Sequence, residues 1–394
     1  MLKDKNLLVL SHTYNSFIKD PVEILSKEFK RVYVLVRYQP ISELAKYIPF
    51  SFFKSRIKYS KEQSIDLTNL PSNVEVIPLP LWYLPFKRFY YPVGKQHAKV
   101  ALKVIKDRNI EFDLIHAHFL WSAGYAGEQI KKVYGKPLVV TGHGYDIYDL
   151  PNRDERLKKG IVTVLKNSNK VLTVSEKNKE NLKSLGRNDV KVFPNGYTNS
   201  LFYFKDKEKC RESLKLPMNK KILLTVGSLE TVKGYEYMIE AIKVVKEKEP
   251  NILCIHIGGG SLEKSLKSLV SNYKLENDFK FLGRISHNLL VDSFGASDMF
   301  VSSSLSEGNP TVMFESLGCG KPFIGTRVGG VPDIVNSSDY GLLCEPKDIE
   351  KLSENIIKAL NTKWDTEKIL SYSKQFSWEN ICKEILKIYM EVLK

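Results

Sequence analysis

The chain has 394 residues, of which 43% are hydrophobic and 27% charged, and this length and composition predict an ordinary globular protein of two or three domains. Its five cysteines are scattered and include no CxxC pair, which disfavours a disulfide scaffold or a zinc ribbon. This pattern favours a location in the reducing environment of the cytosol. The apolar run at residues 7–10 is too short for a signal peptide, and no apolar stretch approaches the length of a membrane span. We therefore expect a cytoplasmic protein.

The net charge of +15 is concentrated in the first half of the chain. Residues 1–200 hold 33 Lys and Arg against 19 Asp and Glu, whereas residues 201–394 hold 27 against 26. Residues 46–61 and 81–99 combine basic and aromatic side chains and contain no acidic residue. This composition suits an anionic membrane interface, stacking on single-stranded nucleic acid, or aromatic loops that pack on their own domain. No nucleic-acid signature accompanies it, so we expect no nucleic-acid partner and favour peripheral contact with the inner face of the cell membrane.

Short apolar runs alternate with helical patterns along the first half of the chain. This alternation is typical of βαβ units and predicts a parallel sheet. The predicted strands lie at residues 7–10, 32–36, 74–77, 114–115, 138–141, 171–174 and 191–193. The predicted helices lie at residues 21–29, 97–108, 121–134 and 156–166.

The same rhythm restarts after an irregular stretch at residues 194–220. Strands are predicted at residues 221–226, 251–257, 279–281, 299–302 and 322–326, and helices at 235–248, 262–273, 310–317 and 378–393. We expect an α/β protein of two doubly wound, Rossmann-like domains that face a central cleft at the carboxyl ends of their strands. The predicted domains are residues 1–198 and 199–375, with a C-terminal helix, 376–394, that packs back on the N-terminal domain.

The segment at residues 304–335 contains two carboxylates in a pattern that suggests a binding site. Asn309 is expected to cap a helix that has Pro310 at its first position, which places Glu307 in the preceding loop and Glu315 inside the helix. The free N–H groups around Thr311 would then form an anion site that fits a diphosphate. The two carboxylates could accept hydrogen bonds from a sugar and from a ribose on either side of it. The alternative is a capping loop in which Glu307 only supports the helix dipole.

These carboxylates belong to a longer series of motifs. The pattern Glu307-x7-Glu315 resembles the signature of the retaining family 4 glycosyltransferases (glycosyl transferases group 1), which have the GT-B fold of two Rossmann-like domains. Further segments resemble motifs of this family in the expected order: residues 116–118 (HAH), 142–144 (GHG), 194–196 (PNG), 226–229 (VGSL), 233–234 (KG), 256–260 (HIGGG), 321–322 (KP) and 329–333 (GGVPD).

The resemblance implies a role for each matching residue. Glu315 would hold the nucleotide ribose, Glu307 the transferred sugar, and Lys233 the diphosphate, whose charge grows as it leaves. His118 would lie near the reacting sugar, and His143 would line the acceptor side. The remaining donor-binding positions implied are Gly227, Ser228, Gly308, Asn309 and Thr311.

Ser228 departs from the family pattern, which usually has Arg at this position. Serine cannot form the bidentate phosphate contact of an arginine. Either Lys233 together with the helix N-terminus holds the diphosphate, or another cation such as Arg284 or Arg327 substitutes, or catalysis is weaker. The loop at residues 11–20 lacks the Gly-Gly usual there, which weakens inference about the acceptor. No Asp-x-Asp pair is present, and we expect neither a metal nor another cofactor.

Together these features predict an enzyme that moves a hexose-type sugar from a nucleotide-diphosphate sugar to a glycan or lipid-linked (polyprenyl) acceptor. The resemblance implies retention of anomeric configuration through front-face substitution. Two alternatives stay open: a nucleotide-sugar epimerase or hydrolase of the same fold, and a non-catalytic sugar-binding relative.

Overall fold

The computed structural model describes residues 2–44, 60–83 and 90–394. Residues 46–59 of the first basic and aromatic segment (46–61) and residues 84–89 of the second (81–99) therefore lie outside the described residues, whereas residues 90–99 lie in helix α5 (Tyr90–Asp107). The chain folds into two compact units. Unit 1 comprises Met1–Pro194 and Trp378–Lys394, and unit 2 comprises Asn195–Ser377.

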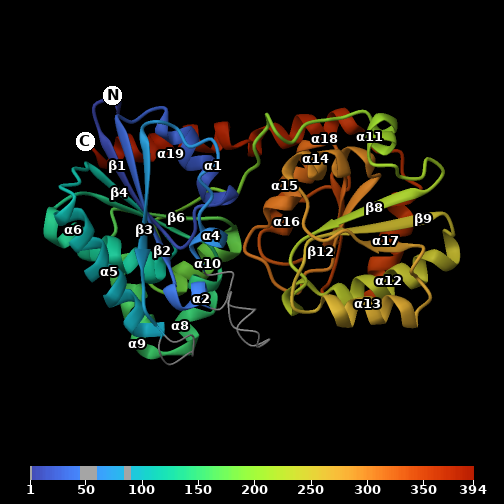
Figure 1. Cartoon of the computed structure of the whole chain (residues 1–394), viewed down its shortest axis with the longest axis horizontal. Helices are drawn as coiled ribbons and strands as arrows, with labels where there is room; N and C mark the ends of the chain where they lie inside the picture. The colour runs from blue at the N-terminus through green and yellow to red at the C-terminus, as the bar shows by residue number, and fades with distance from the viewer. Residues whose placement is uncertain (1, 45–59, 84–89) are drawn as a thin grey trace. The chain divides into compact units, whose positions relative to one another are not determined.

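Unit 1 is built around a parallel sheet that has seven strands among the described residues, in the order β3-β2-β1-β4-β5-β6-β7 (Figure 1). Its strands are β1 (Asn6–Ser11), β2 (Arg31–Tyr38), β3 (Val74–Pro80), β4 (Leu114–His118), β5 (Leu138–Gly142), β6 (Lys170–Thr173) and β7 (Val190–Val192). The helical elements are α1 (Ser16–Ser26), α2 (Pro40–Leu44), α4 (Lys61–Ser64), α5 (Tyr90–Asp107), η3 (Leu120–Gly124), α6 (Tyr125–Tyr134), α7 (Tyr145–Tyr148), α8 (Leu150–Arg153), α9 (Glu155–Asn167), α10 (Glu176–Ser184) and α19 (Trp378–Val392).

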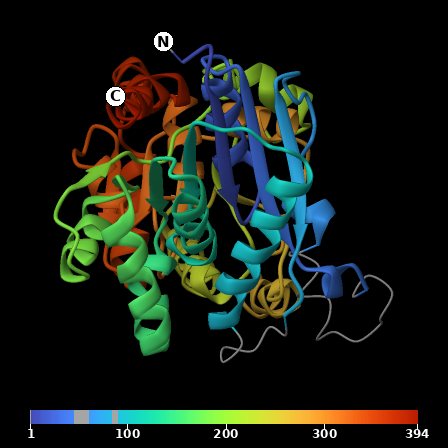
Figure 2. The same ribbon diagram turned by 90° about the vertical axis from the view of Figure 1, so that its left-hand side faces the viewer.

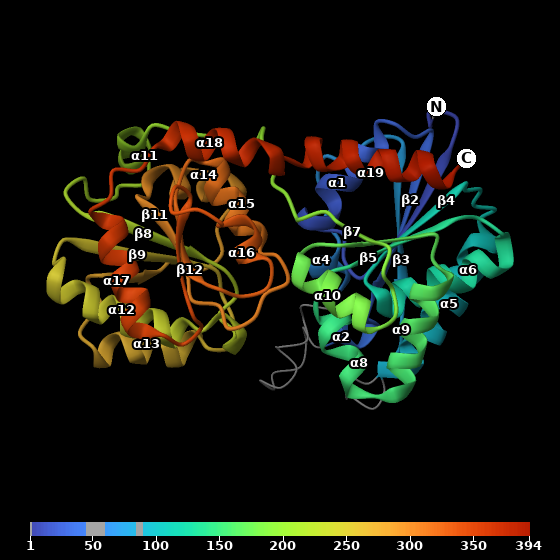
Figure 3. The ribbon, with the colours of Figure 1, turned by 180° about the vertical axis from the view of Figure 1, so that it is seen from behind.

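Helices cover both faces of this sheet. Figure 2 looks onto the side where α5 and α6 lie in front of the strands, and these helices join the core cluster around the fully buried Trp121. The other face is covered by α1 and α19, which lie side by side in Figure 3. The last helix of the chain thus buries Ile381, Ile385 and Tyr389 in the core of unit 1. Burying apolar side chains on both faces explains why the strands are almost continuous apolar runs.

Unit 2 contains a second parallel sheet, in the order β10-β9-β8-β11-β12-β13. Its strands are β8 (Lys221–Val226), β9 (Ile252–Ile257), β10 (Phe279–Phe281), β11 (Met299–Ser302), β12 (Phe323–Thr326) and β13 (Gly341–Cys344). Its helical elements are α11 (Lys207–Ser213), η4 (Thr231–Lys233), α12 (Tyr235–Lys248), α13 (Glu263–Asn272), α14 (His287–Ala296), α15 (Thr311–Gly318), α16 (Val331–Ile334), α17 (Ile349–Leu360), α18 (Thr366–Ser373) and η5 (Lys374–Phe376). Two parallel Rossmann-like sheets confirm the predicted fold class.

Several predicted helix starts differ from the structure, among them that of α5, which begins at Tyr90 rather than at His97. Helix α1 begins at Ser16 rather than at Pro21, because Ile18, Val22 and Leu25 form a continuous buried face that tolerates proline inside the helix. Helix α6 begins at Tyr125, because Trp121 has extended backbone angles and fills the core instead of continuing the helix.

The start of the proposed donor-site helix, α15, also differs, by one residue, and its predicted cap is wrong. The residue that precedes it is Pro310, in extended conformation, and no side chain caps the helix. Asn309 does not cap α15, because its side-chain Oδ1 accepts from the N–H of Asn195 at 3.0 Å, while the Asn195 amide donates to the Asn309 carbonyl at 2.6 Å. Asn309 therefore fastens this loop to the start of unit 2 rather than satisfying the helix amides.

Candidate active site

A lysine and a glutamate meet at the carboxyl edge of the unit 2 sheet. Lys233 ends the short turn η4, which follows β8, and its Nζ lies 2.6 Å from Oε1 of Glu307, in the loop after β11. Ser304 donates to the same carboxylate oxygen at 2.7 Å. The two charged side chains retain 22% and 13% exposure, so the pair is largely shielded but reachable from solvent. The structure thus brings together two predicted site residues that are 74 positions apart.

The backbone holds both partners closely. Ser303 donates to the carbonyl of Lys233 at 3.0 Å, which ties the β8 loop to the β11 loop. Gly234 has a φ of +59°, and a Cβ there would lie 2.4 Å from the Ser303 carbonyl oxygen. Gly329 has a φ of +54°, and a Cβ there would lie 2.1 Å from the Glu307 carbonyl oxygen. Only glycine allows these left-handed turns and close approaches, so the KG and GGVPD motifs have a physical role in fixing the ion pair.

The other predicted donor-site residues lie in the same unit. Gly227 follows β8, and a Cβ built on it would lie 3.8 Å from Cε of Lys233, so the lysine side chain runs past this glycine. Gly308 accepts from the N–H of Gly330 at 2.8 Å, and Thr311 begins α15 with a half-buried side chain. Glu315 lies one turn further along α15 and is 9% exposed.

Ser228, which stands where an arginine was expected, has an exposed side chain. Arg327, one of the suggested substitutes, follows β12 and forms an ion pair with Glu345, with Nε 3.4 Å from Oε1. Arg284 is exposed in the loop after β10. Lys233 is accordingly the cation that the structure places against the Glu307 loop.

The predicted histidines lie in unit 1, where two neighbouring strands end. His118 is the last residue of β4, and His143 follows β5. Nδ1 of His118 lies 3.1 Å from Nε2 of His143, and the rings stack 5.3 Å apart. Burial lowers the pKa of His118 to about 3 and lowers that of His143 well below its ordinary value. Both rings are therefore neutral near pH 7, and the His118 Nε2 has no hydrogen-bond partner among the described residues.

Two residues that the sequence analysis missed orient these histidines. Asp146 is fully buried and accepts from the N–H groups of Leu120, His143 and Gly144 at 2.8 to 3.0 Å, which fixes the backbone after both strands. His116 stacks beside His118 with ring centroids 4.2 Å apart. The alternation in HAH, which puts both histidines on one side of β4, was the available signal for His116.

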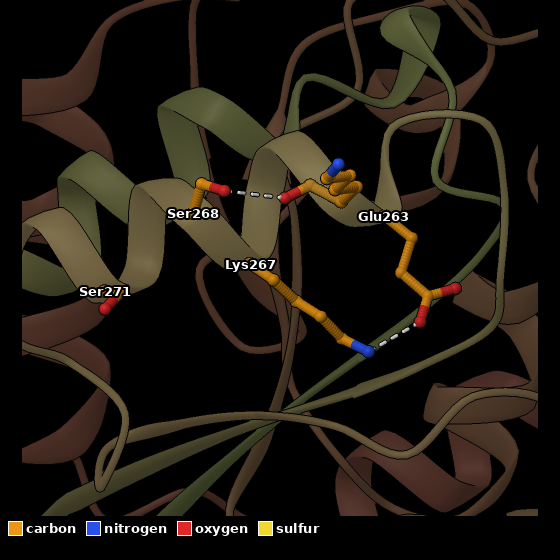
Figure 4. Close-up of a pocket in the computed structure, with 5 residues that line it drawn as sticks. Glu263, Lys267, Ser268 and Ser271 are labelled. Atoms are coloured by element: carbon orange, nitrogen blue, oxygen red, sulfur yellow. Dashed lines mark hydrogen bonds and ion pairs between the residues drawn. The ribbon is translucent and has the colours of Figure 1, made fainter.

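Figure 4 shows a pocket on unit 2. It lies along α13 and is lined by Glu263, Lys264, Lys267, Ser268 and Ser271. Lys267 pairs with Glu263 at 2.7 Å, Ser268 donates to the Lys264 carbonyl at 3.1 Å, and Ser271 donates to Glu276 at 2.7 Å, so these three side chains already have partners within unit 2. No predicted site residue lines it.

The described residues contain no cluster of three or more His, Cys, Asp or Glu placed to hold a metal ion. None of their helices is both long and apolar enough to cross a membrane.

Comparison with known proteins identifies the family. Residues 206–376 match the family described as "Glycosyl transferases group 1", and residues 55–199 match "Glycosyltransferase Family 4". The chain is 30% identical over 279 residues to the putative teichuronic acid biosynthesis glycosyltransferase TuaC of Bacillus subtilis. The aligned region covers 70% of this chain and 67% of TuaC. The chain belongs to the family 4 glycosyltransferases.

Relatives with other names and solved structures agree with this assignment. This glycosyltransferase is 26% identical over 315 residues to the N-acetyl-alpha-D-glucosaminyl L-malate synthase of Bacillus anthracis, covering 77% of this chain and 81% of that one. Sucrose-phosphate synthase of Thermosynechococcus elongatus has the same fold, with a TM-score of 0.76 at 21% identity over 99% of both chains. The Anabaena protein HepE, solved with UDP, gives a TM-score of 0.74 at 20% identity over 98% of this chain and 100% of that one. The predicted GT-B fold and glycosyltransferase family are thus confirmed.

Proposed function

We propose that this glycosyltransferase moves a hexose-type sugar from a nucleotide-diphosphate sugar to a glycan or lipid-linked acceptor, with retention of anomeric configuration. The observation that carries the donor half of the proposal is the Lys233–Glu307 pair beside the start of α15. It supplies a cation for a diphosphate, a carboxylate for sugar hydroxyls and the free amides of a helix N-terminus within one loop cluster. HepE, which has this fold, binds UDP and UDP-glucose.

In the proposed mechanism, Lys233 leaves Glu307 when the donor binds and moves to the diphosphate. Ser304 keeps Glu307 in place, so the carboxylate is free to accept hydrogen bonds from hydroxyls of the transferred sugar. Glu315 would hold the ribose. As the bond between the sugar and the phosphate breaks, negative charge grows on the leaving diphosphate, and Lys233 with the amides around Thr311 would stabilise it. The leaving phosphate would deprotonate the acceptor hydroxyl on the same face of the sugar.

In unit 1, the neutral His118 would contact the transferred sugar through Nε2, and His143 would orient it through the 3.1 Å bond to Nδ1. The acceptor would bind at the edge of the unit 1 sheet where these strands end, as ligands do in open α/β folds. Since Lys233 and helix amides would carry the phosphate charge, we propose that the enzyme needs no metal.

The first experiment measures thermal stabilisation by a panel of nucleotide diphosphates and nucleotide sugars. A ligand at a hundredfold its Kd should stabilise the protein by about 2.7 kcal/mol. The shift should be lost in Glu315→Gln and kept in Glu263→Gln, an exposed glutamate of α13 in the same unit. An equal shift in both variants, or none with any nucleotide in the wild type, would contradict the donor site. Product analysis without acceptor then separates transfer from epimerisation or hydrolysis.

We also propose that the enzyme is a peripheral protein at the inner face of the cell membrane. The support is the excess of basic and aromatic residues in the first half of the sequence, and the exposed Trp82 in the described part of residues 81–99. Neutralising Lys46, Lys54, Arg56 and Lys58 should reduce sedimentation with anionic liposomes. The control neutralises four exposed lysines of unit 2, namely Lys264, Lys267, Lys347 and Lys351. Unchanged sedimentation in the first variant would refute the membrane contact.

A further inference from the structure

A buried arginine lies near the histidines of unit 1 and has no part in the mechanism above. Arg37 stands next to the end of β2 and is 8% exposed. Its Nη1 lies 3.3 Å from the hydroxyl of Ser122, and its Nη2 lies 3.3 Å from that of Tyr90. The rings of Tyr83 and Tyr90 lie about its guanidinium, with centroids 6.0 and 5.8 Å away. All of these neighbours are uncharged.

No carboxylate balances this charge. Among the described residues no Asp or Glu lies within ion-pair distance of Arg37, and the two internal ranges outside that part of the chain, 45–59 and 84–89, contain no acidic residue in their sequence. The buried acid of this sheet edge, Asp146, is held by three backbone amides instead. Buried charges in proteins are ordinarily paired, so a guanidinium without a counter-ion here requires another explanation.

The groups around Arg37 are neutral hydrogen-bonding side chains. His97 is fully buried, its Nδ1 lies 2.9 Å from the Ser122 hydroxyl, and its Nε2 has no partner among the described residues. Nδ1 of His12 lies 3.2 Å from the hydroxyl of Tyr145, which in turn lies 3.3 Å from that of Tyr90. Burial, and then the charge of Arg37, lowers the pKa of His97 to about 3 and that of His12 well below its ordinary value. These histidines therefore add hydrogen-bonding groups without adding charge.

We propose that Arg37 binds an oxyanion, a carboxylate or a phosphate, carried by the acceptor of this glycosyltransferase. The planar guanidinium matches both oxyanions, and its two long hydrogen bonds to hydroxyls leave it available for a charged partner. The His97 Nε2 and the tyrosine hydroxyls would satisfy the remaining oxygen atoms. The proposal rests on the proposed function, because it names the chemical class of the acceptor at the edge of the unit 1 sheet. The positive charge of the first half of the chain would draw such an acceptor to this unit.

The test is calorimetric titration of the full-length protein at low salt with inorganic phosphate, glucuronate and glucose. We expect one of the two anions to bind and glucose not to bind. The anion that binds more tightly shows whether the charged group of the acceptor is a phosphate or the carboxylate of a uronic acid. Arg37→Gln should weaken that binding by about tenfold to a hundredfold. Arg108→Gln is the matched control, because Arg108 is an exposed arginine of the same unit whose partner is Glu75, at 3.0 Å. Binding of neither anion, or equal binding by Arg37→Gln, would overturn the proposal.

A second measurement needs no variant, in case Arg37→Gln does not fold. Phosphate or glucuronate added to wild-type protein labelled with ¹⁵N-histidine should shift the ring resonances of His12 and His97 and leave that of His256, buried in unit 2, unchanged. Unmoved His12 and His97 resonances would also overturn the proposal. Stabilisation by nucleotide diphosphates, recorded on the same samples, tests the donor site independently. Its absence would refute the proposed function, whereas loss of anion binding alone would refute only the role of Arg37.

Discussion

Each unit has a cationic side chain at the edge of its sheet, and the two differ in whether that cation has a counter-ion. In unit 2, Lys233 is neutralised by Glu307, a carboxylate that the proposed mechanism needs for the sugar. In unit 1, Arg37 is buried more deeply, and the described residues around it supply hydroxyls, aromatic rings and neutral histidines. The difference implies two kinds of preparation for ligands. In unit 2, the cation forms an ion pair that must break when the nucleotide-sugar donor binds. In unit 1, the cation has no counter-ion among the described residues, and a bound anion would supply one.

The largest expected effect comes from removing the cation of unit 2. Lys233→Ala should lower kcat by about 10²- to 10³-fold, because a charge aimed at the leaving group acts mostly in the transition state. It also leaves Glu307 without its ion-pair partner. Lys267→Ala, which removes an exposed ion pair of α13, should leave kcat unchanged. Transfer assays with saturating donor check this, and similar rates for both variants would contradict the role of Lys233.

Acid should destabilise unit 1 more than unit 2. His12, His97, His116, His118 and His143 are buried in unit 1, and burial lowers the pKa of each. Below about pH 6.5 these histidines bind protons in the unfolded chain but not in the folded one. Their contribution to the free energy of unfolding is therefore fully present above that pH, and it is lost as the pH falls toward the folded pKa, about 3 for His118. Each such group lowers the free energy of unfolding by about 1.4 kcal/mol per pH unit within that window.

Hydrogen exchange at pH 7 and pH 5 checks this comparison unit by unit. Amides of β4 and β5 should lose protection on acidification, after correction for the intrinsic exchange rate. Those of β8 and β9 should change less, because in unit 2 only His256 has a lowered pKa, about 4, among the described histidines. Equal losses in both units would show that the unit 1 histidines take up protons without unfolding.

Much of the fold was predictable from the sequence because both sheets are parallel and covered on two faces. Strands of this kind are short apolar runs, and residues 221–226 were predicted with the bounds that β8 has. Strand β13 was missed, because its four residues, GLLC, are too few to show a pattern. The helix start at Pro310 and the cap at Asn309 were predicted from local rules, and the hydrogen bonds of Asn309 to Asn195 overrode them.

The site was predictable only in part, and for a different reason. Glu307 and Lys233 lie far apart in sequence, so their placement in one donor site followed from the resemblance to a family, and their ion pair was seen only in the structure. Nothing in the sequence indicated that Arg37 is buried without a carboxylate partner. Its neighbours, Tyr83, Tyr90 and Ser122, are far from it in sequence, and Ser122 belongs to the turn η3. Lys233 could be found by motif, whereas Arg37 required the three-dimensional arrangement.

The smallest effect tests whether Lys233 alone is enough for the diphosphate. Ser228 is exposed beside Gly227, so Ser228→Arg has room for a longer side chain and would add a second cation of the usual family type. We expect it to tighten binding of the donor by about tenfold, the contribution of one charge-assisted hydrogen bond, with no change in melting temperature without ligand. Ser268→Arg, on the exposed face of α13, is the control for added charge. A tighter Kd in titration of Ser228→Arg alone would mean that unit 2 works with an incomplete set of cations. An unchanged Kd would mean that Lys233 and the amides around Thr311 already satisfy the diphosphate.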